Sequence, residues 1–310
     1  MDKLTCMQAL ARVVESGSFA EAARRMGVSA PMVTKYIGHL EQLLGSRLLN
    51  RSTHSLSLTD AGQAYYQRCV QLLEDLDEAE AAAGAQSSQP RGLLRMTVST
   101  DFGIEHLGPV LLEYSRRHPE VRLEVSVSNH LVDLVEEGLD LAVRITAQLR
   151  TNLVAKRLAT SRLIACAAPA YLESHGHPQS PDDLVRHNCL AFSDRLAMGE
   201  HWRFTRTGQT YTVNAVGNLR ATSNELLKLA GLHGHGILLQ PSFNVGDDLR
   251  AGRLVPILTD YDAGSLGIHA VYPHRKYLAA KVQNLIDALA GMWGEDPEAD
   301  PFWTPAARPE

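Results

Sequence analysis

Long apolar runs are missing from this chain, and their absence bounds what it can be. No stretch of about 18 apolar residues appears, so the sequence predicts no transmembrane helix. The N-terminus also lacks the charged and then apolar segments of a secretory signal peptide. We therefore expect a cytoplasmic protein, and a chain of 310 residues suggests two or more domains with cores of their own.

Cysteine is scarce as well. Cys6, Cys69, Cys166 and Cys189 are not spaced as metal ligands, and each lies where a small apolar residue would serve. We predict buried free thiols, with a redox pair of Cys166 and Cys189 as the alternative.

Catalytic motifs are also lacking. The sequence has no nucleophile elbow, no glycine-rich phosphate loop and no metal-binding cluster of histidines, because His233 and His235 flank Gly234 in what reads as a turn. An α/β enzyme is therefore the weakest hypothesis, and we expect no cofactor and no metal.

The most informative segment that is present runs from Glu15 to Arg51. It contains two short helical patterns joined by a tight turn at Gly27. Ser18 and Glu21, three residues apart, predict a capping box at the start of the first helix. Two short helices with this spacing indicate a helix-turn-helix, although two ordinary packed helices would give a similar pattern.

The second helix of the pair has one buried face and one exposed face. Ser29 is placed to cap it, and Pro31 lies in its first turn, where the missing N–H costs nothing. The expected buried stripe is Val33, Ile37, Leu40 and Leu44. The expected exposed face carries Ala30, Pro31, Thr34, Lys35 and Tyr36, at the end that a recognition helix places in a major groove.

Charge separates this part from the rest. Residues 1–59 hold seven lysines and arginines against four acids, a net charge of +3. Residues 60–90 carry −5, and the remaining residues carry −3. Positive charge is thus concentrated where the DNA reader is predicted, as contact with phosphates requires.

Two flanking patterns complete a DNA-binding domain at residues 1–59. A helix is predicted at Lys3–Ser16, and the alternating segment Arg51–Leu58 predicts a short two-stranded wing. Arg51 and His54 are candidates for phosphate or minor-groove contact, and a solvated loop histidine is the alternative for His54.

A linker region at 60–88 follows, in which Thr59 can cap a long helix to about Ala85. Apolar residues recur there with heptad spacing, which predicts pairing with a second copy of the chain. Packing of this seam on the chain's own effector domain is the alternative. The seam consists of Tyr65, Cys69, Leu72, Leu76, Ala79 and Ala83.

Beyond a polar hinge at 86–92, strands and helices alternate, which predicts an α/β domain at 89–293. We expect subdomain one at about 89–161 and 267–293, subdomain two at about 162–266, and a loose tail at 294–310. The expected parallel β-α-β-α-β order of subdomain one includes a helix at Leu131–Glu137, and a polar excursion through Trp202 and Tyr211 is expected in subdomain two.

These residues together resemble the LysR-type transcriptional regulators, over nearly the whole chain. The stretches that carry the resemblance are SGSFAEAARRMGVSAPMVTKYIGHLEQLLGSRLLNRS, LSLTDAGQAYY, HPEVRLEVSVSN, LVEEGLDLAVRI and GHGILLQPSF. The resemblance implies a winged helix-turn-helix, a dimerising linker helix, and a two-subdomain effector domain that resembles periplasmic solute-binding proteins. It also implies dimers, commonly dimers of dimers, that bend promoter DNA, with RNA polymerase as a further candidate partner.

The resemblance places base-reading residues in the second helix, and two positions depart from the family pattern. Ala30 stands where Gln is frequent, so only apolar contact with a base remains there. His54 replaces a commoner Arg, which weakens the expectation of a permanent positive charge on the wing. The predicted DNA-binding residues are Ser29, Ala30, Pro31, Thr34, Lys35, Arg51 and His54.

An effector is expected at the carboxyl ends of the strands, near helix N-termini. Hydroxyl groups and free N–H groups there favour a small organic anion, whereas Asp101 counts against a purely anionic pocket. Helix capping by Ser99, Ser128 or Thr222, and an ion pair of Arg144 with an acid, are the alternatives. The predicted effector-binding residues are Ser99, Thr100, Asp101, Phe102, Ser128, Asn129, Arg144, Ser193, Thr222 and Ser223.

The sequence therefore favours an effector-controlled, sequence-specific DNA-binding protein. The alternative is a small-molecule-binding protein without DNA function, in which the first 90 residues only drive oligomerisation.

Overall fold

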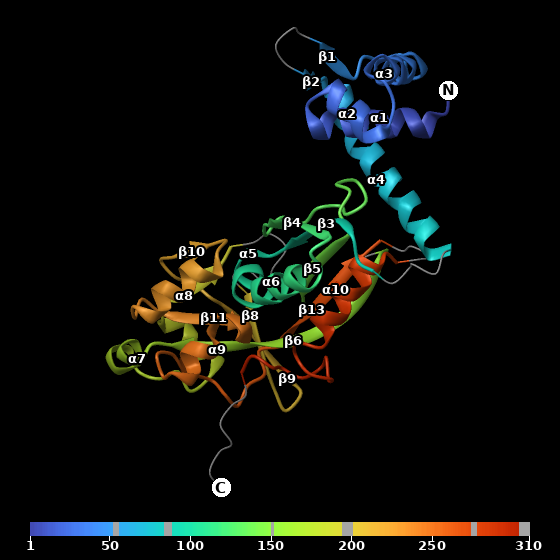
Figure 1. The fold of residues 1–310 in the computed structure, drawn as a ribbon. Helices are drawn as coiled ribbons and strands as arrows, with labels where there is room; N and C mark the ends of the chain where they lie inside the picture. The colour runs from blue at the N-terminus through green and yellow to red at the C-terminus, as the bar shows by residue number, and fades with distance from the viewer. Residues whose placement is uncertain (52–55, 84–88, 150–151, 194–200, 274–277, 304–310) are drawn as a thin grey trace. The chain divides into compact units, whose positions relative to one another are not determined.

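The computed structural model describes residues 1–51, 56–83, 89–149, 152–193, 201–273 and 278–303. The chain folds as two compact units, the first holding Met1–Gly92 and the second most of the residues after it (Figure 1). Within the described ranges, no helix is both long and apolar enough to cross a membrane.

The first unit is a helical domain with a small two-stranded wing. The predicted first helix, helix-turn-helix and wing are all confirmed. Gly27 ends the helix at Phe19–Met26 in the left-handed conformation, with φ of 66°. The wing strands pair antiparallel, with Leu49 opposite Leu58. The elements are α1 (Lys3–Ser16), α2 (Phe19–Met26), α3 (Ala30–Leu44), β1 (Leu49–Arg51), β2 (Leu56–Leu58) and α4 (Asp60–Ala83).

The start of α4 belongs to the core of this unit. Thr59 caps the helix as predicted, because its Oγ1 accepts a hydrogen bond from Gly62 N at 2.9 Å. Cys69 is fully buried and Tyr65 is half-buried, and both pack with residues of α1 to α3. The seam position at Cys69 is therefore filled by the intrachain core, and the dimer seam along the rest of α4 stays a prediction. Leu72, one heptad position further along, is 56% exposed.

The second unit is built on one long mixed sheet, in the order β10-β7-β11-β6-β13-β5-β3-β4 with β12 paired to β6. β3 pairs parallel with β5, whereas β13 runs antiparallel to both β5 and β6. The parallel pairing predicted for subdomain one is thus confirmed for β3 and β5, and the later strand β13 joins the sheet antiparallel. The strands of this sheet are β3 (Gly92–Val98), β4 (Val121–Val127), β5 (Leu141–Thr146), β6 (Val154–Ala167), β7 (Cys189–Phe192), β10 (Arg220–Ala221), β11 (Ile237–Pro241), β12 (Val255–Pro256) and β13 (Ser265–Tyr272).

β6 joins the two halves of this unit. Its first part, residues 154–162, pairs with β13, and its second part, residues 163–166, pairs with β11. We call the part around β3, β4 and β5 the first lobe and the part around β7 and β11 the second lobe. Figure 1 shows β6 passing from one lobe to the other.

Helices cover the sheet in both lobes. In the first lobe Tyr114 of α6 donates its hydroxyl to Lys281 O of α10 at 2.6 Å. In the second lobe Asn244 of α9 donates to Asn224 O at the start of α8. The helices are α5 (Thr100–Phe102), a π-helical turn η1 (Gly103–Leu107), α6 (Gly108–Arg117), α7 (Pro169–His175), a 3-10 helix η2 (Pro181–Arg186), α8 (Asn224–Leu232), α9 (Ser242–Arg250) and α10 (Ala280–Ala290).

The helix predicted at Leu131–Glu137 is not formed. Residues 134–138 form a turn, in which Asp133 Oδ1 accepts from Val135 N at 2.8 Å. Leu134 is buried, but Leu131 and Val135 are exposed, so this segment buries no continuous apolar face that would stabilise a helix.

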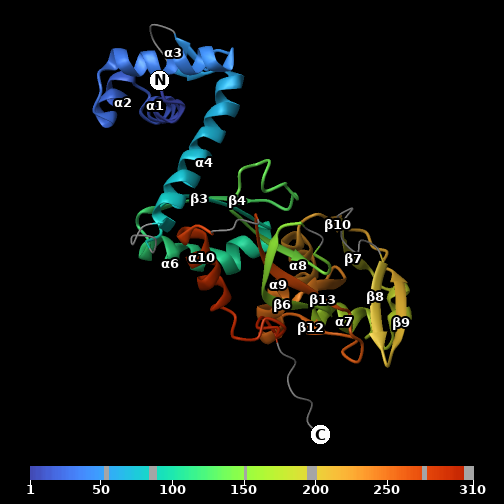
Figure 2. The same ribbon diagram turned by 90° about the vertical axis from the view of Figure 1, so that its right-hand side faces the viewer.

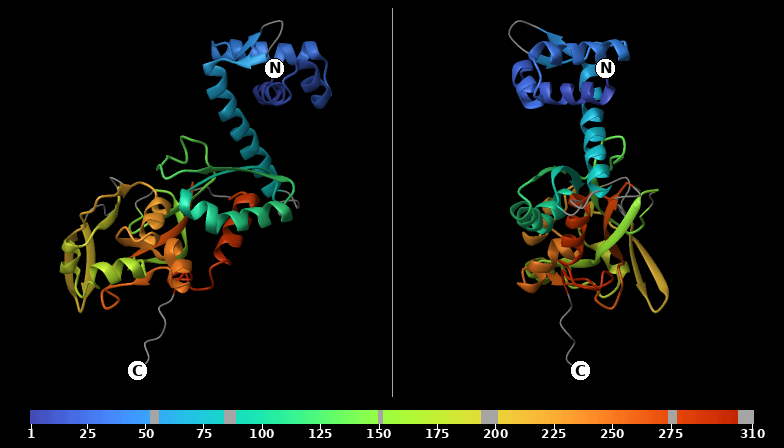
Figure 3. Two further views of the ribbon diagram at one scale, coloured as in Figure 1. Left: turned by 90° about the vertical axis from the view of Figure 1, so that its left-hand side faces the viewer. Right: turned by 45° about the vertical axis from the view of Figure 1, so that its right-hand side comes forward.

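The polar excursion predicted after β7 is instead a hairpin of β8 (His201–Arg206) and β9 (Gln209–Asn214), at the outer edge of the second lobe (Figures 2 and 3). Trp202 and Phe204 alternate with exposed residues along β8 and are buried in the lobe's core. Both turn residues, Thr207 and Gly208, have positive φ, as a two-residue type I′ hairpin turn requires.

The tail predicted to be loose is packed over residues 294–303. Asp300 and Phe302 are buried. The Asp300 carboxylate accepts from the backbone N–H groups of Arg162, Phe302 and Trp303. A buried carboxylate must find hydrogen-bond donors, and the bond from Arg162 N fixes the tail to β6. Residues 304–310 lie outside the described ranges.

Candidate DNA-binding surface and effector site

The N-terminal end of α3 presents four of the predicted DNA-binding residues to solvent. Ser29, Pro31, Thr34 and Lys35 are exposed, and Thr34 also donates its hydroxyl to Ala30 O at 3.1 Å. Ala30 is half-buried and packs against the core of the unit, so only part of its methyl group is available for contact with a base. The side chain of Arg51 and the whole of His54 lie outside the described part of the structure.

Three local predictions around α3 need correction. Ser29 occupies the N-cap position, but its side chain makes no capping hydrogen bond. The capping box of Ser18 and Glu21 is half formed, because Ser18 Oγ accepts from Glu21 N while the Glu21 carboxylate binds arginines instead. Tyr36 was expected on the exposed face, yet it is half-buried against the core.

Hydrogen bonds that the sequence did not predict fix α3 to the wing. Glu41 Oε1 accepts from Leu48 N at 2.9 Å and from Leu49 N at 3.3 Å, so the recognition helix holds the start of β1. Just after β2, Thr59 Oγ1 donates to Arg47 O, before β1, at 2.7 Å. No sequence pattern reports the seven-residue separation of Glu41 and Leu48, since it depends on how the chain turns after α3.

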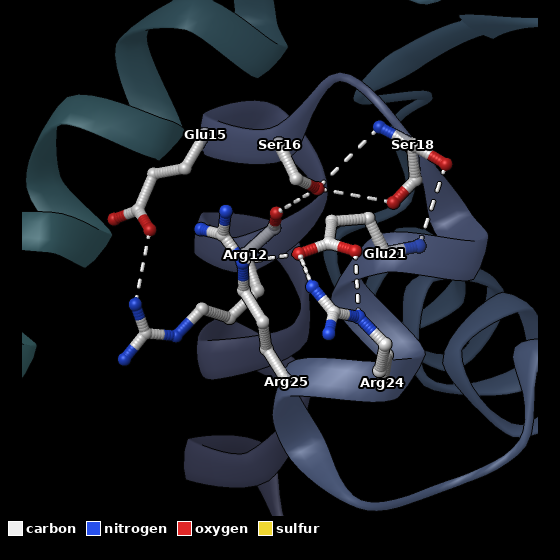
Figure 4. A network of polar contacts seen from close by, with 7 residues as sticks. All are labelled: Arg12, Glu15, Ser16, Ser18, Glu21, Arg24 and Arg25. Carbon is white, nitrogen blue, oxygen red and sulfur yellow. Dashed lines mark hydrogen bonds and ion pairs between the residues drawn. The ribbon is translucent and has the colours of Figure 1, made fainter.

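Arginines of α2 form an ion-pair network beside the turn that leads into α3 (Figure 4). The Glu21 carboxylate accepts from Arg24 Nε at 2.9 Å, Arg24 Nη2 at 2.8 Å and Arg25 Nε at 2.9 Å. The hydrogen bonds from Arg24, and then those from Arg25, lower the pKa of Glu21 to about 2. The i, i+3 and i, i+4 spacing of these residues was a readable signal for the network.

In the second unit, three of the loops predicted to bind effector meet. Asn129, after β4, accepts from Thr100 N through Oδ1 at 3.0 Å. Its amide nitrogen donates to Thr222 O, just before α8, at 3.4 Å. Thr100 and Asn129 belong to the first lobe and Thr222 to the second, so the structure brings predicted residues of both lobes together.

Other predicted effector residues have partners within the protein. Ser223 Oγ caps α8 by accepting from Leu226 N at 3.2 Å, which is the capping role that was weighed for such residues. Ser128 Oγ accepts from His130 N, and Ser193 N donates to Ala221 O. Ser99 precedes α5 without a side-chain cap. Arg144 donates from Nη2 to Val132 O at 2.7 Å, a carbonyl rather than the acid that was considered as its partner.

Asp101 lies buried where the lobes meet. Burial raises the pKa of its carboxyl, while hydrogen bonds from the side chain and backbone of Asn224 act in the opposite direction. Nearby, Lys228 of α8 pairs with Glu225 at 2.8 Å and with Glu105 of the first lobe at 3.5 Å. This interface therefore already holds negative charge, which would disfavour an anion close to Asp101.

Phe102 belongs to the core rather than to an open cleft. It is fully buried, and its ring lies 5.2 Å from that of Phe243, 5.5 Å from Trp293 and 6.0 Å from Phe302. Phe243 comes from the second lobe and Phe302 from the tail, so this aromatic cluster spans three parts of the unit. It leaves Phe102 no exposed surface for a ligand.

All four cysteines are free and buried, as predicted. Burial raises the pKa of the Cys166 thiol, and it raises that of Cys189 to about 12. Both thiols therefore stay protonated, which disfavours the redox pair that was the alternative. Among the described residues, no group of three or more His, Cys, Asp or Glu side chains could hold a metal ion.

Comparison with known proteins identifies the family to which both domains belong. Residues 4–63 match the bacterial regulatory helix-turn-helix protein family of lysR type, and residues 87–294 match the LysR substrate binding domain. The chain belongs to the LysR family. This LysR-family regulator thus has a helix-turn-helix domain and a substrate-binding domain, in line with the fold predicted from its sequence.

Its relatives share nearly the full length. An HTH-type transcriptional regulator of Haemophilus influenzae is 36% identical and covers 92% of this chain and 99% of its own length. The transcriptional activator TtdR of Escherichia coli is 33% identical, covering 92% and 91%. A transcriptional repressor of Pseudomonas aeruginosa is 32% identical, covering 96% and 94%.

Solved structures agree with these matches. The structure of CrgA, a LysR-type transcriptional regulator from Neisseria meningitidis, has a TM-score of 0.60 and 30% identity, covering 92% of this chain and 97% of that chain. The full-length virulence activator AphB of Vibrio cholerae also has a TM-score of 0.60, with 27% identity, covering 94% and 99%.

Proposed function

We propose that this LysR-family regulator reads promoter DNA through the exposed start of α3 and is controlled by a small organic anion bound between the two lobes. The observation that carries the DNA part is the exposed Ser29, Pro31, Thr34 and Lys35 at one helix end, in a domain of positive net charge. Arg51 and His54 are proposed to contact phosphates or the minor groove from the wing. Because its target is chromosomal DNA, we place the protein in the cytoplasm.

The effector part is supported by the junction of Thr100, Asn129 and Thr222. These residues come from loops at strand ends in both lobes, and their hydrogen bonds join the lobes. An anion bound there, on the side away from Asp101, would meet the N-terminus of α8, where the helix dipole favours negative charge. Binding that draws the lobes together would alter how the subunits present their two DNA readers.

The DNA part is tested by a mobility-shift titration with the promoter next to the protein's own gene and with a scrambled duplex. Thr34→Ala and Lys35→Ala should each weaken promoter binding, by roughly five- to a hundred-fold if a base contact of about 1–3 kcal/mol is lost. Equal binding of the two duplexes, or full promoter binding by both variants, would favour the alternative, a small-molecule-binding protein without DNA function.

The effector part is tested by thermal-shift screening of the full chain against small carboxylic acids and their uncharged amides. A ligand at about 100 times its Kd stabilises the fold by about 2.7 kcal/mol, which a melting curve detects. Acids should raise the melting temperature where their amides do not, and Thr222→Val should reduce the shift. A response to amides alone would contradict an anionic effector.

Assembly belongs to the same proposal. Two readers in one dimer bind two half-sites on one face of DNA, and a dimer of dimers would allow bending. RNA polymerase is a proposed further partner for the case in which the outcome is activation.

A further inference from the structure

Arg24 and Arg25 lie where a helix-turn-helix approaches the DNA backbone. They occupy the last turn of α2, just before Gly27 and the exposed start of α3. In proteins of this class the first helix of the pair crosses the phosphate backbone while the second enters the groove. These two guanidinium groups are therefore close, along the chain, to the surface that the proposed function assigns to DNA.

Both arginines are bound to one carboxylate in the free protein. Glu21 takes two hydrogen bonds from Arg24 in a fork geometry and a third from Arg25 (Figure 4). A phosphate would bind Arg24 through the same Nε and Nη2 fork that Glu21 occupies. The carboxylate and a DNA phosphate are thus competing acceptors for the same donors.

The exposure of these side chains shows that the exchange is feasible. The side chain of Arg24 is 78% exposed and that of Arg25 47%, against 29% for Glu21. Exposed ion pairs of this kind contribute only about 0–1 kcal/mol, so a DNA phosphate can replace the carboxylate. With a pKa of about 2, Glu21 remains charged throughout the neutral range and competes at every pH where the protein works.

We infer that Glu21 limits the affinity of this regulator for DNA by holding Arg24 and Arg25, two phosphate ligands, in internal ion pairs. The inference rests on the proposed DNA-binding function and adds a residue to it. Since phosphates are the same in every sequence, Glu21 should lower affinity for all duplexes uniformly and leave sequence preference unchanged.

The test compares Glu21→Gln with wild type on a promoter duplex and a scrambled duplex over a series of salt concentrations. Glutamine keeps the length of the side chain, and the Ser18 cap uses the backbone N–H of residue 21, so α2 retains its cap. Releasing the arginines should add about one phosphate contact, which makes the slope of log K against log salt steeper by about 0.9. Raising salt four-fold should then cost the variant roughly three- to four-fold more affinity than wild type.

The matched control is Glu15→Gln in α1. Glu15 also pairs with an arginine, through Arg12 Nη1 at 3.0 Å, but that pair is on α1 rather than beside the turn into α3. Its affinities and salt slope should equal those of wild type. A melting curve for each variant reports whether the domain is folded.

A second variant removes the released ligands. Arg24→Ala and Arg25→Ala, introduced together into Glu21→Gln, should abolish the gain on both duplexes. Unchanged or weaker binding by folded Glu21→Gln would overturn the inference, and weaker binding would mean that Glu21 orients the arginines for phosphate. If wild type binds neither duplex, the proposed DNA-binding function fails first and the inference falls with it.

Discussion

At the residue scale, the burial of His269 and the charges beside it make the stability of this protein depend on pH. His269 on β13 lies opposite Arg144 on β5 and Arg157 on β6, so an imidazolium there would have cationic neighbours on both sides. Burial, and then the charge of Arg157, lower the pKa of His269, while Glu298 acts in the opposite direction.

We expect the stability of the folded protein to decrease as pH falls below about 6.5, the ordinary pKa of histidine. Because His269 takes up its proton less readily in the folded chain, acidification favours the unfolded chain, and the stability is complete only above that pH. His269→Gln should show a smaller fall in melting temperature between pH 7.5 and 5.5. His201→Gln, exposed on β8, is the control and should behave as wild type.

The space available for a side chain at single glycines also affects the stability of the DNA-binding unit. A Cβ at Gly62, at the start of α4, would lie 1.9 Å from Leu48 O, whereas one at Gly38 of α3 would meet nothing within 4 Å. Gly62→Ala should therefore destabilise the DNA-binding unit by about 1–3 kcal/mol or more, since the clash is with backbone. Gly38→Ala should stabilise the same unit by about 0.5–1 kcal/mol. Denaturant unfolding of both variants measures the contrast, and equal effects would contradict it.

At the scale of elements, most helices and strands could be located from the sequence, but the segments against which they pack could not. α1 has the predicted bounds, Lys3–Ser16, because caps, breakers and periodicity are local signals. The missing helix after β4 and the hairpin of β8 and β9 depend on long-range partners. Trp202 and Phe204 make β8 a strand only because the core of the second lobe is there to receive them.

The packed tail is the clearest element-scale case. Thr160 Oγ1 on β6 donates to Pro297 O at 2.8 Å, and Phe302 closes the aromatic cluster with Phe102 and Phe243. We expect Phe302→Ala to destabilise the second unit by about 3–5 kcal/mol, since it opens a cavity between the lobes.

The control for that variant is Glu298→Ala in the same tail. It removes an ion pair with Arg157, and the side chain of Glu298 is 67% exposed. It should cost less than about 1 kcal/mol. Thermal and denaturant unfolding of the full chain distinguish the two. A loss for Phe302→Ala no larger than that of the control would show that the tail does not hold the lobes together.

At the scale of the whole molecule, the two units carry separate functions that the family joins in one chain. DNA reading needs the first unit, and effector binding needs the second. The linker helix is the proposed means of assembly, and Leu72 is its exposed apolar seam position, whereas the position of Cys69 is filled by the intrachain core.

We expect Leu72→Glu to weaken self-association, because it places a charge on an exposed apolar seam position that a second copy would bury. Sedimentation would then show a smaller species, and affinity for a two-half-site promoter would fall more than affinity for a scrambled duplex. Gln67→Glu, an exposed position of α4 off the seam, is the control and should keep the wild-type mass. An unchanged mass for Leu72→Glu would place the interface elsewhere.

The sequence by itself determined the family, the helix-turn-helix and the loops proposed to bind effector. These follow from capping residues, glycine turns and apolar periodicity, which act between residues close in the chain. Only the tertiary structure decided that Glu41 accepts from the start of β1, that Phe102 lies in the core, and that the tail joins the lobes. Those outcomes depend on which groups compete for one partner or one cavity in space, and the order of residues does not specify that competition.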